Sequence, residues 1–172
     1  LGNRLEMKYT KLFTQKWKIA SKADVARYLL HEFILELCTA INLGNYSDRR
    51  KKLDELLSQH SWTKRETAYV LKQFNRIISW IKNIFPNDSI RHTRFRNKSD
   101  FYSLFIVLLK LINKGYVTLD KKSNRTAGQF LLEFSKQIQR LDPKIKAYDL
   151  HEKLSRQERK MLPYIISTRQ ST

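Results

Sequence analysis

Glycine and proline are scarce in this sequence, and their scarcity limits the possible folds more than any other feature. The 172 residues include only 4 Gly and 3 Pro, well below the roughly 12% that the two residues together reach in ordinary proteins. A β-protein with many turns needs these residues at its turns. The sequence therefore predicts an all-α protein.

Apolar residues recur at three- and four-residue spacing along several stretches, as they do on the buried face of a helix. The clearest stretch begins at Thr63, where Glu66 three residues later completes a capping box, and it ends at Pro86. Four further helices are expected, namely 5–17, 21–41 with Ser21 and Asp24 at its start, 47–59, and 127–141 with Asp142-Pro143 as its stop.

One helix is expected at the centre of the bundle. Between Phe101 and Ile112 nearly every position is apolar, which is typical of a helix buried on all sides. Ser99 is the expected N-cap, and Gly115 is expected to take the left-handed conformation just past the helix end. Residues 116–124 are interpreted as a connector rather than a short strand. The predicted fold is a compact bundle of six or seven helices around a central helix near 100–113.

Length and composition also predict domain organisation and location. A chain of 172 residues is expected to form a single domain over 1–172. Cys38 is the only cysteine, which excludes an intramolecular disulfide and favours a reducing, cytoplasmic location. The longest apolar run falls short of the ~20 residues that cross a bilayer, so no membrane association is expected. The sequence does not begin with Met, and we expect it to be part of a longer protein.

The motifs that usually mark an enzyme of this size are absent from the sequence. The glycines at 2, 44, 115 and 128 stand alone, so there is no phosphate-binding loop. His31 and His151 are each followed by Glu, but position 35 is Leu and position 155 is Ser, where a zinc-binding pair needs a second His. Cys38 is interpreted as a small buried apolar residue. We therefore predict no catalytic residue, no metal site and no cofactor.

The strongest chemical signal is positive charge. The chain has 34 Lys and Arg against 16 Asp and Glu, a formal net charge of +18. Arginine can grip phosphate oxygens through two hydrogen bonds at once, so a dense basic cluster predicts a nucleic-acid partner, with DNA favoured. Such contacts position a nucleic acid but do not read its sequence. The candidate contact residues are Arg91, His92, Arg94, Arg96 and Lys98, then Arg49, Arg50 and Lys51, and then Lys121, Lys122 and Arg125.

Two other interpretations of the same charge stay open. The basic surface can dock an acidic protein partner, which makes the chain a protein-interaction module. Alternatively, the chain is part of a nuclease or nucleotide hydrolase whose active site lies outside it.

The segment Arg94–Phe105, RFRNKSDFYSLF, follows a long amphipathic helix and a polar break. This order of helix, polar break and segment resembles the helical region of the GmrSD-type proteins. These proteins are bacterial phage-defence nucleases of the type IV restriction kind. Lys22–Leu30, KADVARYLL, is similar to the helix that follows their N-terminal domain. The resemblance extends over 18–172.

This resemblance implies that the chain is the helical, non-catalytic module of a restriction or defence nuclease. Its partner in the same protein would be a ParB/sulfiredoxin-like domain that hydrolyses nucleotides. The family's Asp-Gly-Gln-Gln-Arg nucleotide motif and its His-Asn-His nuclease signature have no counterpart here. No catalytic residue is therefore carried over.

Overall fold

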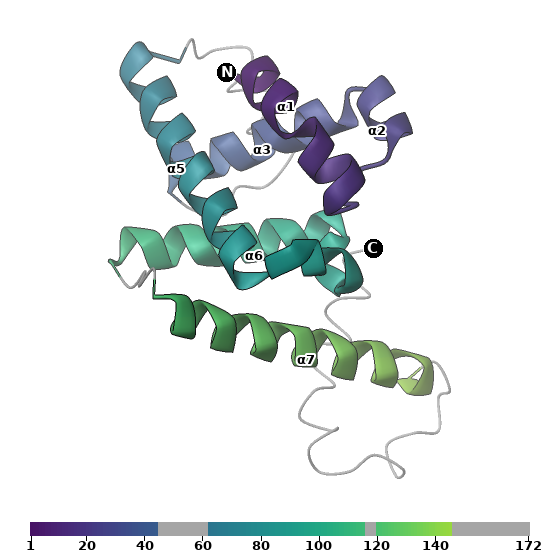
Figure 1. Ribbon diagram of the computed structural model, residues 1–172. Helices are drawn as coiled ribbons and strands as arrows, with labels where there is room; N and C mark the ends of the chain where they lie inside the picture. Colours follow the sequence, from purple (N-terminus) through teal and green to yellow (C-terminus); the bar gives the residue numbers. More distant parts are fainter. Residues whose placement is uncertain (45–61, 116–119, 146–172) are drawn as a thin grey trace. The chain divides into compact units, whose positions relative to one another are not determined.

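A computed structural model describes residues 1–44, 62–115 and 120–145. These residues form helices and the turns between them, with no strand in any of the three ranges, so the predicted all-α fold is confirmed. The elements in chain order are α1 (Gly2–Lys11), the π-helical turn η1 (Leu12–Lys16), α2 (Lys22–Ala26), α3 (Leu29–Leu43), α5 (Lys64–Ile84), the 3-10 turns η2 (Pro86–His92) and η3 (Arg94–Arg96), α6 (Lys98–Asn113) and α7 (Lys121–Ile145) (Figure 1).

The chain divides into two compact units, Leu1–Arg125 and Thr126–Thr172. The division falls inside α7, so the first unit contains α1 to α6 and the first residues of α7. The single domain expected over 1–172 stays a prediction.

α6 forms the centre of the first unit, as its nearly uniform apolar composition predicts. Eight of its residues are buried, among them Phe101 and Phe105. The ring of Phe101 lies 5.6 Å from Phe13 and 6.0 Å from Phe33, and Phe105 lies 5.5 Å from Phe74 (centroid distances). The central helix thus contacts α3, α5 and the η1 turn through edge and tilted aromatic pairs, which add attraction beyond the area they bury.

Helix starts and ends follow local chemistry. The expected capping box at Thr63 with Glu66 is present, and the helix start expected at Ser21 is also a capping box, with Asp24. Gly115 takes the left-handed conformation (φ 73°) after α6, as predicted. The expected N-cap Ser99 is wrong, because α6 begins two residues earlier and Asn97 is its N-cap.

Three further boundaries differ from the sequence predictions. The helix expected over 21–41 is broken, because Tyr28 takes the left-handed conformation (φ 60°), which ends α2 before α3 begins. α7 begins at Lys121 rather than Ala127, so the expected connector to 124 ends earlier. α7 also passes Pro143 and ends at Ile145. A proline this near a helix end costs one N–H donor of the last turn rather than a run of hydrogen bonds. The helix expected over 47–59 lies outside the described residues.

Candidate nucleic-acid interface

The segment between α5 and α6 carries the densest basic cluster of the sequence, and the structure makes it a firmly held pair of 3-10 turns. Ile90 and Phe95 are buried, and Phe95 packs against Phe85 at 5.9 Å between ring centroids. The Thr93 hydroxyl donates to the Ile90 carbonyl (2.8 Å) and accepts from the Phe95 amide (3.1 Å). The backbone therefore holds the flanking cations in fixed positions.

Two of the four permanent cations of this segment are committed to carboxylates. Arg94 makes a two-bond ion pair with Asp100 (Nε 3.1 Å, Nη2 2.8 Å), and its side chain is only 12% exposed. Lys98 donates to Asp24 of α2 at 3.0 Å. The geometry therefore does not favour Arg94 and Lys98 as the phosphate contacts that the sequence predicts.

The remaining candidates of the segment are exposed. Arg91 donates from Nε to Nε2 of His92 at 2.9 Å, and both side chains face solvent. Arg96 is also exposed and has no carboxylate partner among the described residues. These three side chains stay available to an anion.

The helix N-termini near these clusters already carry carboxylates of their own. Asp100 lies in the first turn of α6. Before α7, the Asp120 carboxylate accepts hydrogen bonds from the amides of Ser123 (2.8 Å) and Lys122 (3.3 Å), and these bonds lower its pKa. A phosphate would compete with the Asp120 carboxylate for these backbone donors. Lys121, Lys122 and Arg125 are exposed on α7, and Arg49, Arg50 and Lys51 lie outside the described residues.

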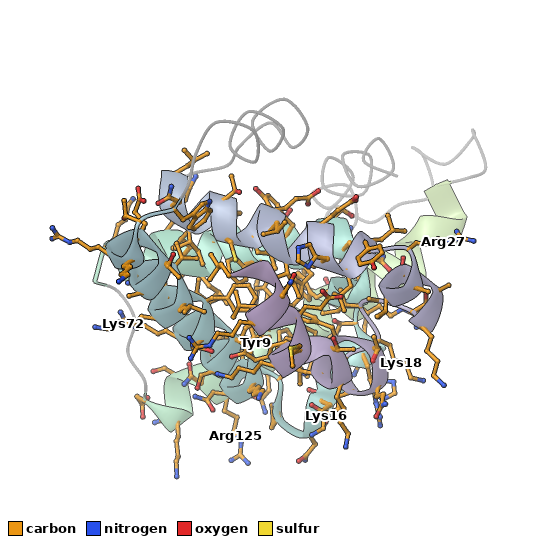
Figure 2. The ribbon with its side chains drawn as sticks, turned by 90° about the horizontal axis from the view of Figure 1, so that it is seen from above. Tyr9, Lys16, Lys18, Arg27, Lys72 and Arg125 are labelled. Carbon is orange, nitrogen blue, oxygen red and sulfur yellow. The ribbon has the colours of Figure 1, made fainter. Side chains whose placement is uncertain are left out.

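A second basic region was not predicted, and it involves the two helices α1 and α5, which meet at Asn75. The Lys8 ammonium donates to Asn75 Oδ1 at 2.7 Å, and the Tyr9 hydroxyl donates to the same oxygen. The Tyr9 ring lies 5.4 Å from Phe74. Figure 2 shows Tyr9 in the region between the two helices and Lys72 pointing outward from α5.

The two helices run in the same direction along this seam. After the contacts of Tyr9 with α5, the next contacts along the chain join Trp17 to Asp88 (Nε1 to Oδ1, 3.2 Å) and Lys16 to the same carboxylate (3.7 Å). Both of the helices that meet at Tyr9 and Asn75 carry exposed cations. We call this group of residues the α1–α5 basic surface; its exposed members are Arg4, Lys8 and Lys11 of α1 and Lys72, Arg76 and Lys82 of α5.

This surface is almost free of negative charge. Residues 1–18 and 63–85 together contain ten Lys and Arg but only two acids, Glu6 and Glu66. Glu6 bonds to His31 Nδ1 at 2.8 Å, and Glu66 bonds to Thr63 in the capping box. Five of the six cations of the surface make no ion pair or hydrogen bond within the part of the chain that the structure describes, and Lys8 bonds only to an amide oxygen.

The sequence carried a signal for this surface that we did not use. The charge imbalance is visible in each of the two segments, but they lie about sixty positions apart, and only the fold shows that they meet at Tyr9 and Asn75. A local search for clustered cations finds 91–98 instead, where the neighbouring acids become visible only in three dimensions.

Other kinds of site have little support in the described ranges. No group of three His, Cys, Asp or Glu that could hold a metal occurs among these residues. Cys38 is fully buried, as expected, and burial raises its pKa to about 12. None of the described helices is long and apolar enough to cross a membrane.

No family model, no curated protein and no solved structure matches this chain. The resemblance to the helical region of GmrSD-type nucleases therefore stays a prediction.

Proposed function

We propose that this chain is a non-catalytic helical module that binds the phosphate backbone of nucleic acid through the α1–α5 basic surface. The observation that carries the proposal is the presence of six exposed cations on two helices that meet at Tyr9 and Asn75, and whose two acids are both bonded elsewhere. A polyanion that covers this face releases the counterions condensed on its phosphates, which favours binding.

The setting of the module is part of the same proposal. The RFRNKSDFYSLF and KADVARYLL segments support a place in a restriction or defence nuclease of the GmrSD type, joined to a ParB-like nucleotide-hydrolysing domain. A cytoplasmic location agrees with an intracellular nucleic-acid partner. The sequence of the full-length gene product tests this setting, since an upstream Asp-Gly-Gln-Gln-Arg motif supports it and a different upstream domain overturns it.

The binding proposal is tested by removing charge from one helix at a time. In Lys72→Gln/Arg76→Gln, two exposed cations of α5 become neutral while the buried face of the helix is unchanged. The matched control is Lys110→Gln/Lys114→Gln, which removes two exposed cations at the end of α6. Affinity for a labelled oligonucleotide is measured by fluorescence anisotropy, and circular dichroism confirms that each variant is folded.

We expect the α5 variant to bind about tenfold more weakly than the wild type, and the α6 control to stay within about twofold. Equal weakening by both variants would mean that net charge alone attracts nucleic acid. A third variant, Arg91→Gln/Arg96→Gln, measures what the exposed cations between α5 and α6 add. A wild-type protein that binds no nucleic acid near physiological salt would favour the acidic protein partner instead.

A further inference from the structure

An exposed tyrosine lies among the cations of α5. Tyr69 is 43% exposed, whereas the other aromatic residues of this helix, Phe74 and Trp80, are buried. Its neighbours on the outward face are Arg65 four residues before it, and Lys72 and Arg76 three and seven residues after it. Residues at these spacings share one face of a helix.

The backbone that presents Tyr69 is well anchored. The next residue, Val70, is fully buried, and so is Phe74 one turn later. The core of the first unit is thus closed without the Tyr69 ring. A large aromatic side chain held on a rigid helix offers a flat surface that loses little freedom when a ligand covers it.

A held ammonium group lies on the other flank of α5. The Lys8 Nζ donates to Asn75 Oδ1 (2.7 Å) and lies 5.2 Å from the centroid of the Tyr9 ring. Asn75 is itself fixed, because its Nδ2 donates to the Leu71 carbonyl at 2.7 Å. An ammonium carries three N–H donors, so Lys8 keeps two for a phosphate while the seam holds it in place.

Cations and an exposed aromatic ring on one face are the arrangement that single-stranded nucleic acid requires. Its phosphates need positive charge, and its unpaired bases have exposed faces that stack on aromatic side chains. In a duplex, each base is covered by its neighbours in the stack, and a surface tyrosine gains nothing from it. The Tyr69 ring therefore distinguishes single-stranded from duplex nucleic acid, whereas the cations bind the phosphates of both.

We propose that the α1–α5 basic surface prefers single-stranded nucleic acid, with Tyr69 as the stacking platform and with Lys8, Lys72 and Arg76 among the phosphate contacts. The inference deepens the proposed function and rests on it. It names the form of nucleic acid that this surface takes.

The test compares a single-stranded oligonucleotide of about 16 nucleotides with the duplex of the same sequence. Binding is measured by anisotropy for wild type, Tyr69→Leu and Tyr69→Phe. The matched control is Tyr28→Leu, which removes an exposed tyrosine (71% exposed) at the start of α3 rather than on α5. We expect the wild type to bind the single strand more tightly than the duplex.

Loss of the ring in Tyr69→Leu is expected to weaken single-strand binding about tenfold and to change duplex binding by less than about twofold. Tyr69→Phe keeps the ring and is expected to bind like the wild type, as is Tyr28→Leu. Equal affinity of the wild type for both forms, or a Tyr69→Leu variant that binds single strands normally, would overturn the inference.

These outcomes separate this inference from the proposed function. If both nucleic acids bind equally and the loss of Lys72 and Arg76 still weakens them, phosphate binding stands and the single-strand preference fails. If the wild type binds neither form, the proposed function fails first.

Discussion

Trp80 and Asn124 are both buried and share one hydrogen bond, from the indole N–H to the amide oxygen at 2.6 Å. The bond joins α5 to the first turn of α7 within the first unit. Asn124→Ala would leave the buried indole N–H without its acceptor, which costs about 1–3 kcal/mol of unfolding free energy. Urea unfolding measures the loss, and the exposed Asn83→Ala on α5 is the control. An Asn124→Ala protein as stable as the control would show that this bond does not stabilise the fold.

Cys38 shows how burial sets chemistry at a single residue. Because burial raises its pKa to about 12, the thiol stays protonated at every pH below that value, and only the thiolate is nucleophilic. We expect the native protein to react with a thiol-specific dye at least about a hundredfold more slowly at pH 8 than the unfolded protein does. Absorbance follows the reaction with and without denaturant. Rapid, stoichiometric labelling of the native chain would contradict the buried position.

Single residues also mark the limit of sequence prediction at this site. The basic residues of 91–98 were recognisable, but the partners of two of them were not. Asp24, which binds Lys98, lies 74 positions away. Asp100 lies six positions from Arg94, but they meet only because one tight turn and a helix start intervene. Charge composition predicts which residues are cations, whereas the fold decides which of them stay available.

At the scale of elements, Asp24 joins two helices and gives the fold a pH dependence. Its carboxylate accepts hydrogen bonds from the amide (2.6 Å) and hydroxyl (2.7 Å) of Ser21 at the start of α2, and from Lys98 of α6. The bonds to Ser21 and then to Lys98 lower the pKa of Asp24 to about 2. A carboxyl group with a lowered pKa stabilises the folded state above its ordinary value of about 4, and this contribution is lost as the pH falls towards 2.

Asp24→Asn removes the charge but not the shape of this side chain. We expect it to lower the melting temperature at neutral pH and to have a diminishing effect as the pH falls from about 4 to about 2. Thermal melts of both proteins across this range measure the difference. Glu32→Gln, which removes an exposed carboxylate of α3, is the control. A difference that stays constant down to the lowest pH would contradict the assigned role of the carboxylate.

The helices themselves were largely predictable, because periodicity and capping are local properties. The stripe of α5 and the capping box at Thr63 and Glu66 lie within one stretch of chain, and both were found. The break at Tyr28 was missed, because a tyrosine in the left-handed conformation contradicts its ordinary preference and only the packing of α2 and α3 imposes it. The end of α7 past Pro143 was also missed, because proline signals a helix end only approximately.

At the scale of the whole first unit, the main functional feature comes from long-range assembly. α3 crosses behind α1 and α5 in Figure 1, and α1 meets α5 at Tyr9 and Asn75. Each helix contributes an ordinary solvated basic face. The contact between them joins two helices that each carry three of the six cations, and the acids of both helices are held elsewhere by His31 and Thr63.

The salt dependence of binding tests this account most directly. If the six cations of the α1–α5 basic surface neutralise phosphates of a single strand, log affinity falls with log salt at a slope of about −4, since each contact contributes about −0.7. Lys72→Gln/Arg76→Gln is then expected to flatten the slope by about 1.4, whereas Lys110→Gln/Lys114→Gln leaves it unchanged. A slope near zero, or one that the two variants reduce equally, would contradict the claim that this surface binds the phosphate backbone.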